Sequence, residues 1–152
     1  MESVPGFATA PSAERARVCV ADRLHERRTY PAVAASVRLA REDVVALARH
    51  GGAVGEQLES IRLAISEAAT NVVRHAYRDG PGTIQLTALL ADGVLSVLIA
   101  DDGCGVRTPT DSPGLGWGMA LIAQAGERFT VAERPGGGTE ALVEFRIAPE
   151  TN

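Results

Sequence analysis

The stretch "EAATNVVRHAY", residues 67–77, sets polar side chains among small apolar residues that would suit a buried helix. At about 100° per residue, Glu67, Asn71 and Arg74 fall within roughly 60° of one another on one side of such a helix, and His75 lies at the boundary. The opposite side predicts a broad core contact, made by Leu58, Ile61, Ile65, Ala68, Ala69, Val72 and Ala76.

Two explanations of the polar side are open when the helix is taken alone. A solvated surface would account for it, as for most amphipathic helices. Asn71, however, is of a residue type that fits helix interiors poorly. Arg74 and Arg78 are like charges four residues apart, which a helix shaped only for stability would avoid. An acid, a carboxamide and a base in one row suit a site that holds a cation together with a polyphosphate.

A second polar feature follows an apolar run. "VLIADDGCGV", residues 97–106, predicts a buried strand that leads into Asp101 and then into Gly103 and Gly105. A single Asp-x-Gly-x-Gly is also ordinary turn chemistry, and we expect the adjacent Asp102 to be solvated. A buried carboxylate at a strand end needs a hydrogen-bond partner or water.

Two glycine-rich segments complete the set. In "GLGWGMALI", residues 114–122, Gly116 and Gly118 open a predicted helix whose N-terminus would present N–H groups to an anion. In "GGGTEALVEF", residues 136–145, Thr139 starts a predicted strand. The glycines do not spell G-x-G-x-x-G after an early βαβ unit, and no G-x-x-x-x-G-K-[ST] occurs. This excludes the dinucleotide-binding and P-loop classes.

The rest of the chain predicts a single α+β domain. Residues 1–22 mix Pro, Gly, Ser and Ala and indicate a flexible N-terminal arm. A helix would begin with Pro31 in its first turn and run to about His50. Its predicted core face consists of Val33, Val37, Ala40, Val44 and Leu47. The other predicted elements are a short strand ending at Tyr30, a helix over 55–78, a hairpin over 83–101, a loop over 103–118, a helix over 117–126 and two strands within 129–147.

Composition excludes several classes of protein. The 152 residues carry a net charge of −4 and no sustained basic run, which argues against direct nucleic-acid binding. Cys19 and Cys104 stand far apart without a second pair, which argues against a disulfide scaffold or a zinc site. The apolar runs near the start are far too short for a signal peptide or a membrane span. We therefore expect a soluble cytoplasmic protein with no membrane partner.

Taken in order, the polar and glycine-rich segments resemble the boxes of the GHKL ATPase superfamily, which includes gyrase, MutL and the histidine kinases. "LAISEAATNVVRHAY" resembles its N box, "IADDGCGV" and "GWGMALI" its two glycine boxes, and "GGGTEALVEF" its closing strand segment. The resemblance covers about residues 30–147. It implies an α+β, two-layer α/β sandwich of the Bergerat type, with a mostly antiparallel mixed sheet and helices on one face. It also implies a histidine-kinase-like ATP-binding domain over residues 23–149.

Within that superfamily, the short chain and the form "SEAATNVVRHAY" resemble the anti-sigma factor serine/threonine kinases of the RsbW and SpoIIAB type. This resemblance implies a Mg-ATP-dependent protein serine kinase that sequesters a sigma factor and phosphorylates a STAS-domain anti-anti-sigma protein. It also implies a homodimer. The alternative is a nucleotide-gated protein-binding regulator without significant kinase activity, and the presence of both Glu67 and Asn71 favours the kinase.

The resemblance implies a role for each polar side chain. Glu67 would be the general base that accepts the proton of a substrate serine. Asn71 would coordinate Mg²⁺ through its side-chain oxygen, a hard ligand that this ion prefers. Asp101 would accept a hydrogen bond from the adenine amino group of ATP, and Thr139 would help to bind adenine through water.

The remaining candidates would lie around the phosphates, the sugar and the base. Arg74 and His75 could touch the phosphates, and Gly103 and Gly105 would let the backbone approach the base and sugar. An extra Gly-Leu pair precedes the glycines of the second box. Three glycines are therefore candidates to cradle the phosphates: Gly114, Gly116 and Gly118.

Overall fold

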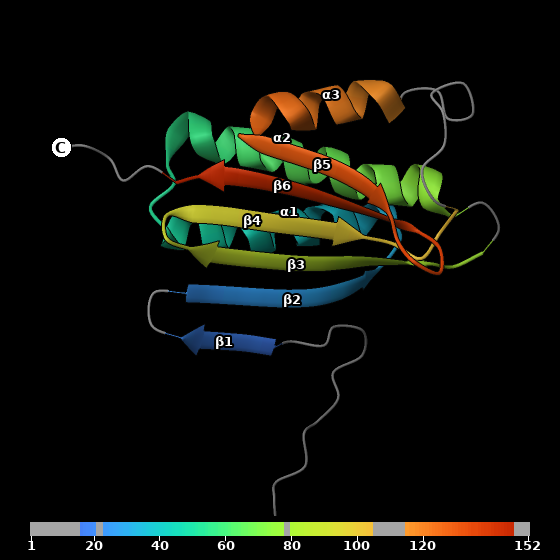
Figure 1. Cartoon of the computed structure of the whole chain (residues 1–152), viewed down its shortest axis with the longest axis horizontal. Helices are drawn as coiled ribbons and strands as arrows, with labels where there is room; N and C mark the ends of the chain where they lie inside the picture. The colour runs from blue at the N-terminus through green and yellow to red at the C-terminus, as the bar shows by residue number, and fades with distance from the viewer. Residues whose placement is uncertain (1–15, 21–22, 78–79, 105–114, 148–152) are drawn as a thin grey trace, which may run out of the picture.

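The chain folds around one six-stranded antiparallel sheet (Figure 1). The computed structural model describes residues 16–20, 23–77, 80–104 and 115–147, with only the backbone of 16–20 and 115–117. The elements are β1 (Ala16–Val20), β2 (Arg23–Pro31), α1 (Ala34–His50), α2 (Gly55–Asn71), the π-helical turn η1 (Val72–Ala76), β3 (Thr83–Ala91), β4 (Val94–Ala100), α3 (Leu115–Ala125), β5 (Arg128–Glu133) and β6 (Thr139–Arg146).

The strand order is β1-β2-β3-β4-β6-β5, so the last strand of the chain lies between β4 and β5. All five pairings described are antiparallel, which confirms an α+β architecture but corrects the expectation of a partly mixed sheet. β3 and β4 form the predicted hairpin, and its turn contains Asp92 and Gly93, both with positive φ. A turn of this kind matches the natural twist of two adjoining strands.

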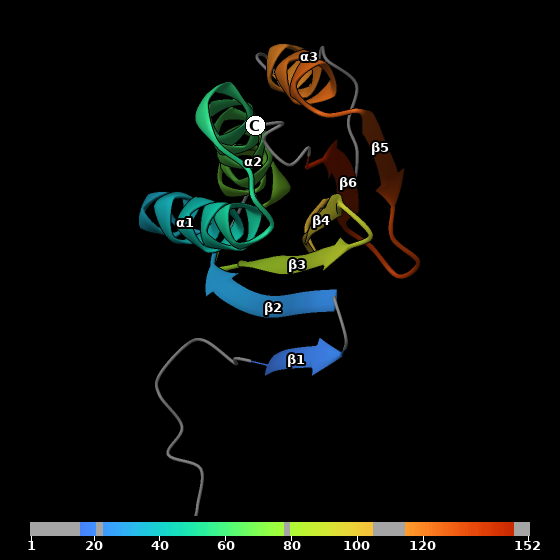
Figure 2. The same ribbon diagram turned by 90° about the vertical axis from the view of Figure 1, so that its left-hand side faces the viewer.

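The three helices cover one face of the sheet, as predicted (Figure 2). α1 packs on β2 and β3, α2 on β6, and α3 on β5. Side chains of the strands alternate, so that every second residue of β3 points into the helix layer. The core between the layers is formed mainly by aliphatic residues and includes Val44, Ile61, Ile65, Ile84, Leu86, Leu95, Val97 and Val143.

The helix layer differs from the sequence prediction at two boundaries. Pro31 is the last residue of β2, paired with Thr83, and α1 begins only at Ala34. Val33 therefore lies outside the helix and is 49% exposed, so its predicted place in the core is wrong. The predicted second helix stops being α-helical at Asn71 and continues as a π-helical turn. π-helical turns are rare and often mark functional sites.

The N-terminal arm also differs in part. Residues 16–20, which were assigned to the arm, form β1 and pair with β2. Residues 1–15 and 21–22 lie outside the described part of the chain, so the flexibility expected of them stays a prediction.

A buried group of charged residues joins β2 to α1. The Arg28 guanidinium lies 2.8 Å from a carboxylate oxygen of Glu26 and 2.8 Å from one of Asp43. The Tyr30 hydroxyl donates a hydrogen bond to Asp43. Burial, followed by the hydrogen bond to Asp43, raises the pKa of Tyr30 far above its ordinary value. These contacts fix the helix on the sheet through charge as well as through apolar packing.

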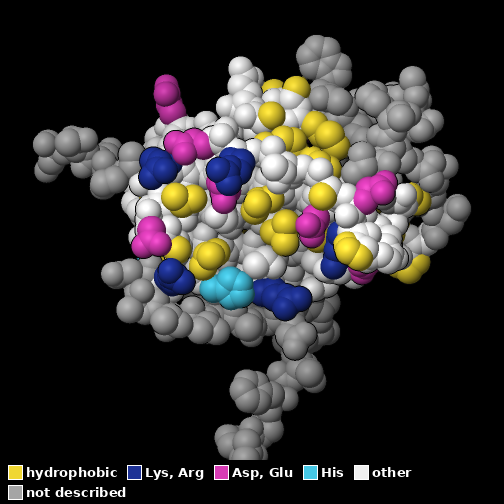
Figure 3. All heavy atoms as spheres, in the orientation of Figure 1, with side chains coloured by type: hydrophobic (Ala, Val, Ile, Leu, Met, Phe, Trp, Pro, Cys, Tyr) yellow, Lys and Arg dark blue, Asp and Glu magenta, His cyan; other side chains and the backbone are white. Residues whose placement is uncertain are grey.

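Within the described part of the chain, no helix covers the other face of the sheet (Figure 2). Seen in Figure 3, this face mixes apolar side chains with both positive and negative ones, and no single charge sign dominates it. A polar hollow lies on it, lined by Arg27, Thr29, Gln85, Thr87, Leu98, Ala100, Arg134 and Glu140.

Candidate functional site

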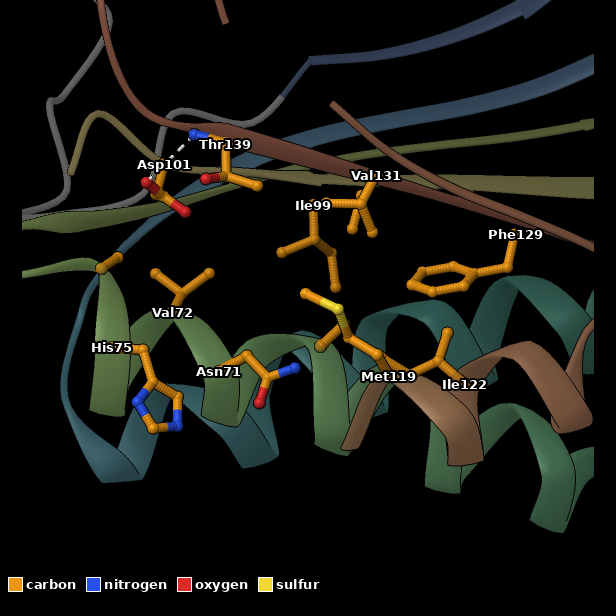
Figure 4. A pocket seen from close by; sticks show the side chains of 13 residues that line it. Asn71, Val72, His75, Ile99, Asp101, Met119, Ile122, Phe129, Val131 and Thr139 are labelled. Atoms are coloured by element: carbon orange, nitrogen blue, oxygen red, sulfur yellow. Dashed lines mark hydrogen bonds between the residues drawn. The ribbon is translucent and has the colours of Figure 1, made fainter. Parts of the chain in front are cut away.

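A pocket opens between the sheet and the helices α2 and α3 (Figure 4). It encloses about 530 Å³, part of it open solvent at the mouth. Its walls are mostly apolar, and a few polar groups stand at one end: Asn71, His75, Asp101 and Thr139. The apolar walls are formed by Ala68, Val72, Ala76, Ile99, Met119, Ile122, Phe129, Val131 and Ala141. A flat apolar molecule that carries hydrogen-bonding groups at its edge would fit such a lining.

Asp101 stands directly after β4 and is 5% exposed. Its backbone N–H donates to the Thr139 carbonyl at 2.9 Å, and the Thr139 N–H donates back to the Asp101 carbonyl at 3.3 Å. One carboxylate oxygen, Oδ1, accepts from the N–H groups of Gly103 at 2.9 Å and Thr139 at 3.3 Å. The second oxygen, Oδ2, has no partner among the described residues and faces the pocket (Figure 4).

Burial raises the pKa of the Asp101 carboxyl, and the adjacent Asp102 adds to the effect. The hydrogen bonds from Gly103 and Thr139 and the charge of Arg134 oppose it without cancelling it. A buried carboxylate oxygen without a protein partner is costly unless a ligand or water donates to it. The end of β4 therefore presents an acceptor that is ready for a donor group of a ligand.

Two glycines allow the backbone to come close to Asp101. A β-carbon on Gly103 would lie 2.0 Å from the Ala76 carbonyl oxygen, so any side chain there would collide with the end of the helix. A β-carbon on Gly138 would lie 1.9 Å from the Asp101 carbonyl oxygen, and Gly138 also has a φ of +94°. Both positions therefore depend on glycine for contact between segments that are distant in sequence.

The helix side of the pocket is formed by the end of α2 and by η1. Asn71 is the last α-helical residue, and His75 lies in the π-helical turn. Both are half-buried and line the pocket. Burial, followed by the charge of Arg74, lowers the pKa of His75. Arg74 itself is exposed and does not line the pocket.

Glu67 and Asn71 meet α3 at Gly118. A β-carbon on this buried glycine would lie 3.1 Å from a Glu67 carboxylate oxygen and 3.2 Å from the Asn71 side-chain oxygen. The two side chains, one helical turn apart, therefore direct oxygen atoms to the same place on α3. Glu67 is half-buried beside the pocket but does not line it.

Some predicted residues cannot be placed in this geometry. Gly105 and Gly114 lie outside the described residues. Gly116 lies in the first turn of α3, where the structure describes the backbone alone. Asp102 is solvated as expected, with its side chain 63% exposed, and it also accepts hydrogen bonds from Arg134 at 2.8 Å and Gln85 at 3.0 Å.

Sequence reasoning missed Arg134 and the part of the apolar wall that α3 and β5 contribute. Arg134, from the turn between β5 and β6, also donates to the Asp101 carbonyl at 3.1 Å. No local pattern identifies such a long-range contact. The alternation of Phe129 and Val131 along β5, in contrast, gave a signal for inward-facing positions that could have been used.

Comparison with known proteins adds independent information. The family of histidine kinase-like ATPase domains matches residues 30–144. An anti-sigma F factor from Clostridium acetobutylicum is 25% identical over 104 residues, covering 61% of this chain and 73% of that protein. A serine-protein kinase RsbW from Bacillus mycoides is 36% identical over 80 residues, covering 53% of this chain and 50% of the kinase.

A solved structure shows the same fold. The crystal structure of the RsbU and RsbW domains of a Mycobacterium tuberculosis protein superimposes with a TM-score of 0.62 at 26% identity. The match covers 86% of this chain and 34% of the mycobacterial chain. The chain thus spans about half the length of the RsbW kinase and about a third of the solved protein. Among the described residues, no helix has the length and apolar character needed to cross a membrane.

Proposed function

Because the chain belongs to the family of histidine kinase-like ATPase domains, we propose that it binds Mg-ATP and transfers the γ-phosphoryl group to a serine of a partner protein. The observation that carries this proposal is Asp101, a buried carboxylate with one oxygen held by two N–H groups and the other facing an apolar pocket. An adenine ring, with an amino group at its edge, has the complementary shape and chemistry.

The pocket suits the two ends of the nucleotide differently. Ile99, Val131 and Met119 provide apolar surface for the faces of a purine. Asp101 Oδ2 would accept from the amino group, and Thr139 stands beside it. His75 lines the pocket from η1, on the helix side, and Arg74 precedes it in the same turn, so that an imidazole and a cation there would favour the phosphates.

Asn71 suits a magnesium ion that is held mainly by phosphates. Mg²⁺ takes hard oxygen ligands and keeps several waters, so one or two protein oxygens are enough beside a nucleotide. The side-chain oxygen of Asn71, which lines the pocket and lies next to Gly118, would be such a ligand. The ion would neutralise charge on the phosphates during transfer.

Glu67 would act on the incoming hydroxyl group. In the transfer, the serine oxygen forms a bond to the γ-phosphorus, the bond from that phosphorus to the β–γ bridging oxygen breaks, and ADP leaves. The serine proton passes to the Glu67 carboxylate. Glu67 lies one helical turn from Asn71 and beside the pocket without lining it, a position that would let it meet a hydroxyl approaching from outside.

The names of the relatives suggest the partners. The Clostridium relative is named an anti-sigma F factor and the Bacillus relatives are named serine-protein kinases. We propose that this chain likewise binds a sigma factor and phosphorylates a STAS-domain anti-anti-sigma protein, and that it acts as a homodimer in the cytoplasm.

Two substitutions on α2 separate binding from transfer. Glu67→Gln should keep nucleotide affinity within about twofold but slow transfer by about 10²- to 10⁴-fold, because only the proton acceptor is lost. Asn71→Ala should weaken both Mg-nucleotide binding and transfer. Calorimetry with Mg-ADP and phosphate transfer to a STAS partner are the measurements. Glu56→Gln, an exposed acid in the first turn of the same helix, is the matched control and should change neither.

Each result has a clear meaning. Transfer at the wild-type rate by Glu67→Gln would show that Glu67 is not the base. If the wild-type protein binds nucleotide and a sigma factor but transfers no phosphate to any partner, the protein is a nucleotide-gated binding regulator instead.

A further inference from the structure

Tyr77 stands where the chain leaves the π-helical turn, and its side chain bridges two other segments. The hydroxyl donates to the Thr83 carbonyl at 2.7 Å and accepts from the Asp102 N–H at 3.1 Å. The ring lies directly on Gly82, where an added β-carbon would be only 2.3 Å from three ring atoms. One phenol thus connects the end of the helix, the start of β3 and the turn that follows Asp101.

In the described part of the turn that follows Asp101, residues 102–104, every N–H group has an acceptor. The Asp102 N–H donates to the Tyr77 hydroxyl, the Gly103 N–H to Asp101 Oδ1, and the Cys104 N–H to the Ala76 carbonyl at 2.8 Å. Two of these three acceptors belong to the neighbouring residues Ala76 and Tyr77. The end of the helix therefore determines where the turn lies, and the turn determines where the Asp101 carboxylate points.

We propose that Tyr77 is a positioning residue for base recognition: its hydroxyl holds the Asp102 N–H, and through that turn it aims Asp101 Oδ2 at the adenine amino group. This inference rests on the proposed nucleotide function of the pocket. Tyr77 does not line the pocket, so it acts on the ligand only through Asp101. Without the hydroxyl, the Asp102 N–H and the Thr83 carbonyl lose their common partner, and the carboxylate is held less closely in place.

A displaced Asp101 should affect only the recognition of the base edge that carries the amino group in adenine. ADP carries an amino group where IDP carries a carbonyl oxygen, which an ionised Asp101 would repel. The ratio of the Kd for IDP to the Kd for ADP therefore measures how well Asp101 is placed. A variant that only lowers stability weakens both nucleotides equally and leaves the ratio unchanged, whereas a variant that displaces Asp101 lowers it.

The test uses Tyr77→Phe, with Tyr30→Phe as the matched control. These are the two tyrosines of the chain, and each hydroxyl is hydrogen-bonded, that of Tyr30 to Asp43 at the α1–β2 contact. We expect Tyr77→Phe to reduce the ratio of the Kd for IDP to the Kd for ADP by about 5- to 10-fold. This is the change in affinity that the loss of one hydrogen bond typically causes. Tyr30→Phe should lower the unfolding midpoint but keep the wild-type ratio. Calorimetry gives both Kd values, and circular dichroism verifies that each variant is folded.

A second variant protects the test against a poorly folded Tyr77→Phe. Gly82→Ala leaves Tyr77 intact but pushes its ring away, and should lower the same ratio. If the wild-type protein binds no nucleotide, the proposed function fails first. If it binds ADP and both variants keep the wild-type ratio, or if neither variant folds, Tyr77 serves folding alone and the proposal is overturned.

Discussion

Asp101 combines a structural cost with a proposed binding role. Its carboxyl is buried, and the two N–H groups that hold Oδ1 do not cancel the effect of burial on its pKa. In the unfolded chain an aspartate titrates near about 3.9. The folded protein therefore binds this proton more tightly than the unfolded chain, and stability falls as the pH rises through the folded pKa.

Asp101→Asn should consequently be more stable than the wild type at neutral pH when no ligand is present. The amide cannot ionise, and its oxygen can still accept from Gly103 and Thr139. The difference in unfolding free energy should shrink as the pH is lowered through the folded pKa and vanish below about 3.9. Urea unfolding at several pH values measures it. The same variant should bind ADP about 10- to 100-fold more weakly, because a hydrogen bond to a charged group is lost. If the difference in unfolding free energy between Asp101→Asn and the wild type did not change with pH, ionisation of Asp101 could not be its cause.

Some of the site could be predicted from single residues, and some could not. The burial of Asp101 follows from its place after an apolar strand, and Asn71 and His75 line the pocket because both lie on one side of α2 and η1. The two hydrogen bonds of the Tyr77 hydroxyl could not be predicted. They join positions 77, 83 and 102, and no spacing along the chain indicates which of these would meet.

The turn between β5 and β6 shows how one element depends on its glycines. Gly136 and Gly138 both have positive φ, +88° and +94°. Gly136 has open space around its α-carbon, whereas Gly138 lies against the Asp101 backbone. The two positions therefore separate the cost of an unusual conformation from the cost of a collision.

Gly136→Ala should lower the unfolding free energy by about 1–2 kcal/mol, the cost of a left-handed conformation for a residue with a side chain. Gly138→Ala should cost at least about 2 kcal/mol more, because the methyl group would overlap a backbone oxygen that cannot move without breaking the pairing of Asp101 with Thr139. Urea unfolding compares them. Gly138→Ala should also abolish ADP binding, which Gly136→Ala should retain. Equal destabilisation by both substitutions would show that the turn is free to shift.

Elements with a strong local pattern were predicted well, and their boundaries less well. The helical spacing of apolar residues identified α2, and the alternation of inward and outward residues identified β3 and β4. The boundary of α1 was misplaced because Pro31 suits a first helical turn as well as a strand end, and its pairing with Thr83 decides between them. β1 was missed because a strand at the edge depends on its neighbour more than on its own residues.

For the molecule as a whole, nucleotide binding should stabilise the native state. A ligand that binds only the folded protein adds RT ln(1 + [L]/Kd), about 2.7 kcal/mol at a hundredfold excess over Kd. Mg-ADP or Mg-ATP should therefore raise the melting temperature. GTP should raise it much less, because a carbonyl replaces the amino group opposite Asp101. Thermal unfolding monitored by circular dichroism tests this. Equal shifts with ATP and GTP would refute the role of Asp101, and no shift with any nucleotide would refute the proposed function.

The α+β architecture with helices on one face could be predicted, but the strand order could not be derived from periodicity. β6 follows β4 and β5 in the chain but lies between them in the sheet, where it pairs with both. Only the resemblance of the ordered boxes to a known superfamily implied that the segments of residues 63–77, 97–106 and 136–145 would come together. Local sequence patterns do not report contacts of this range.

The place of β6 has a consequence for how the protein is made. β6 (Thr139–Arg146) follows β4 and β5 in the chain, so until it has been synthesised β5 lacks the strand that it pairs with and Asp101 lacks the Thr139 backbone beside it. The proposed nucleotide pocket, which Thr139 and Ala141 of β6 help to line, is therefore incomplete on the growing chain until β6 has emerged. A chain interrupted before Thr139 should therefore fail to bind ATP, and ATP-dependent capture would separate it from chains that contain β6.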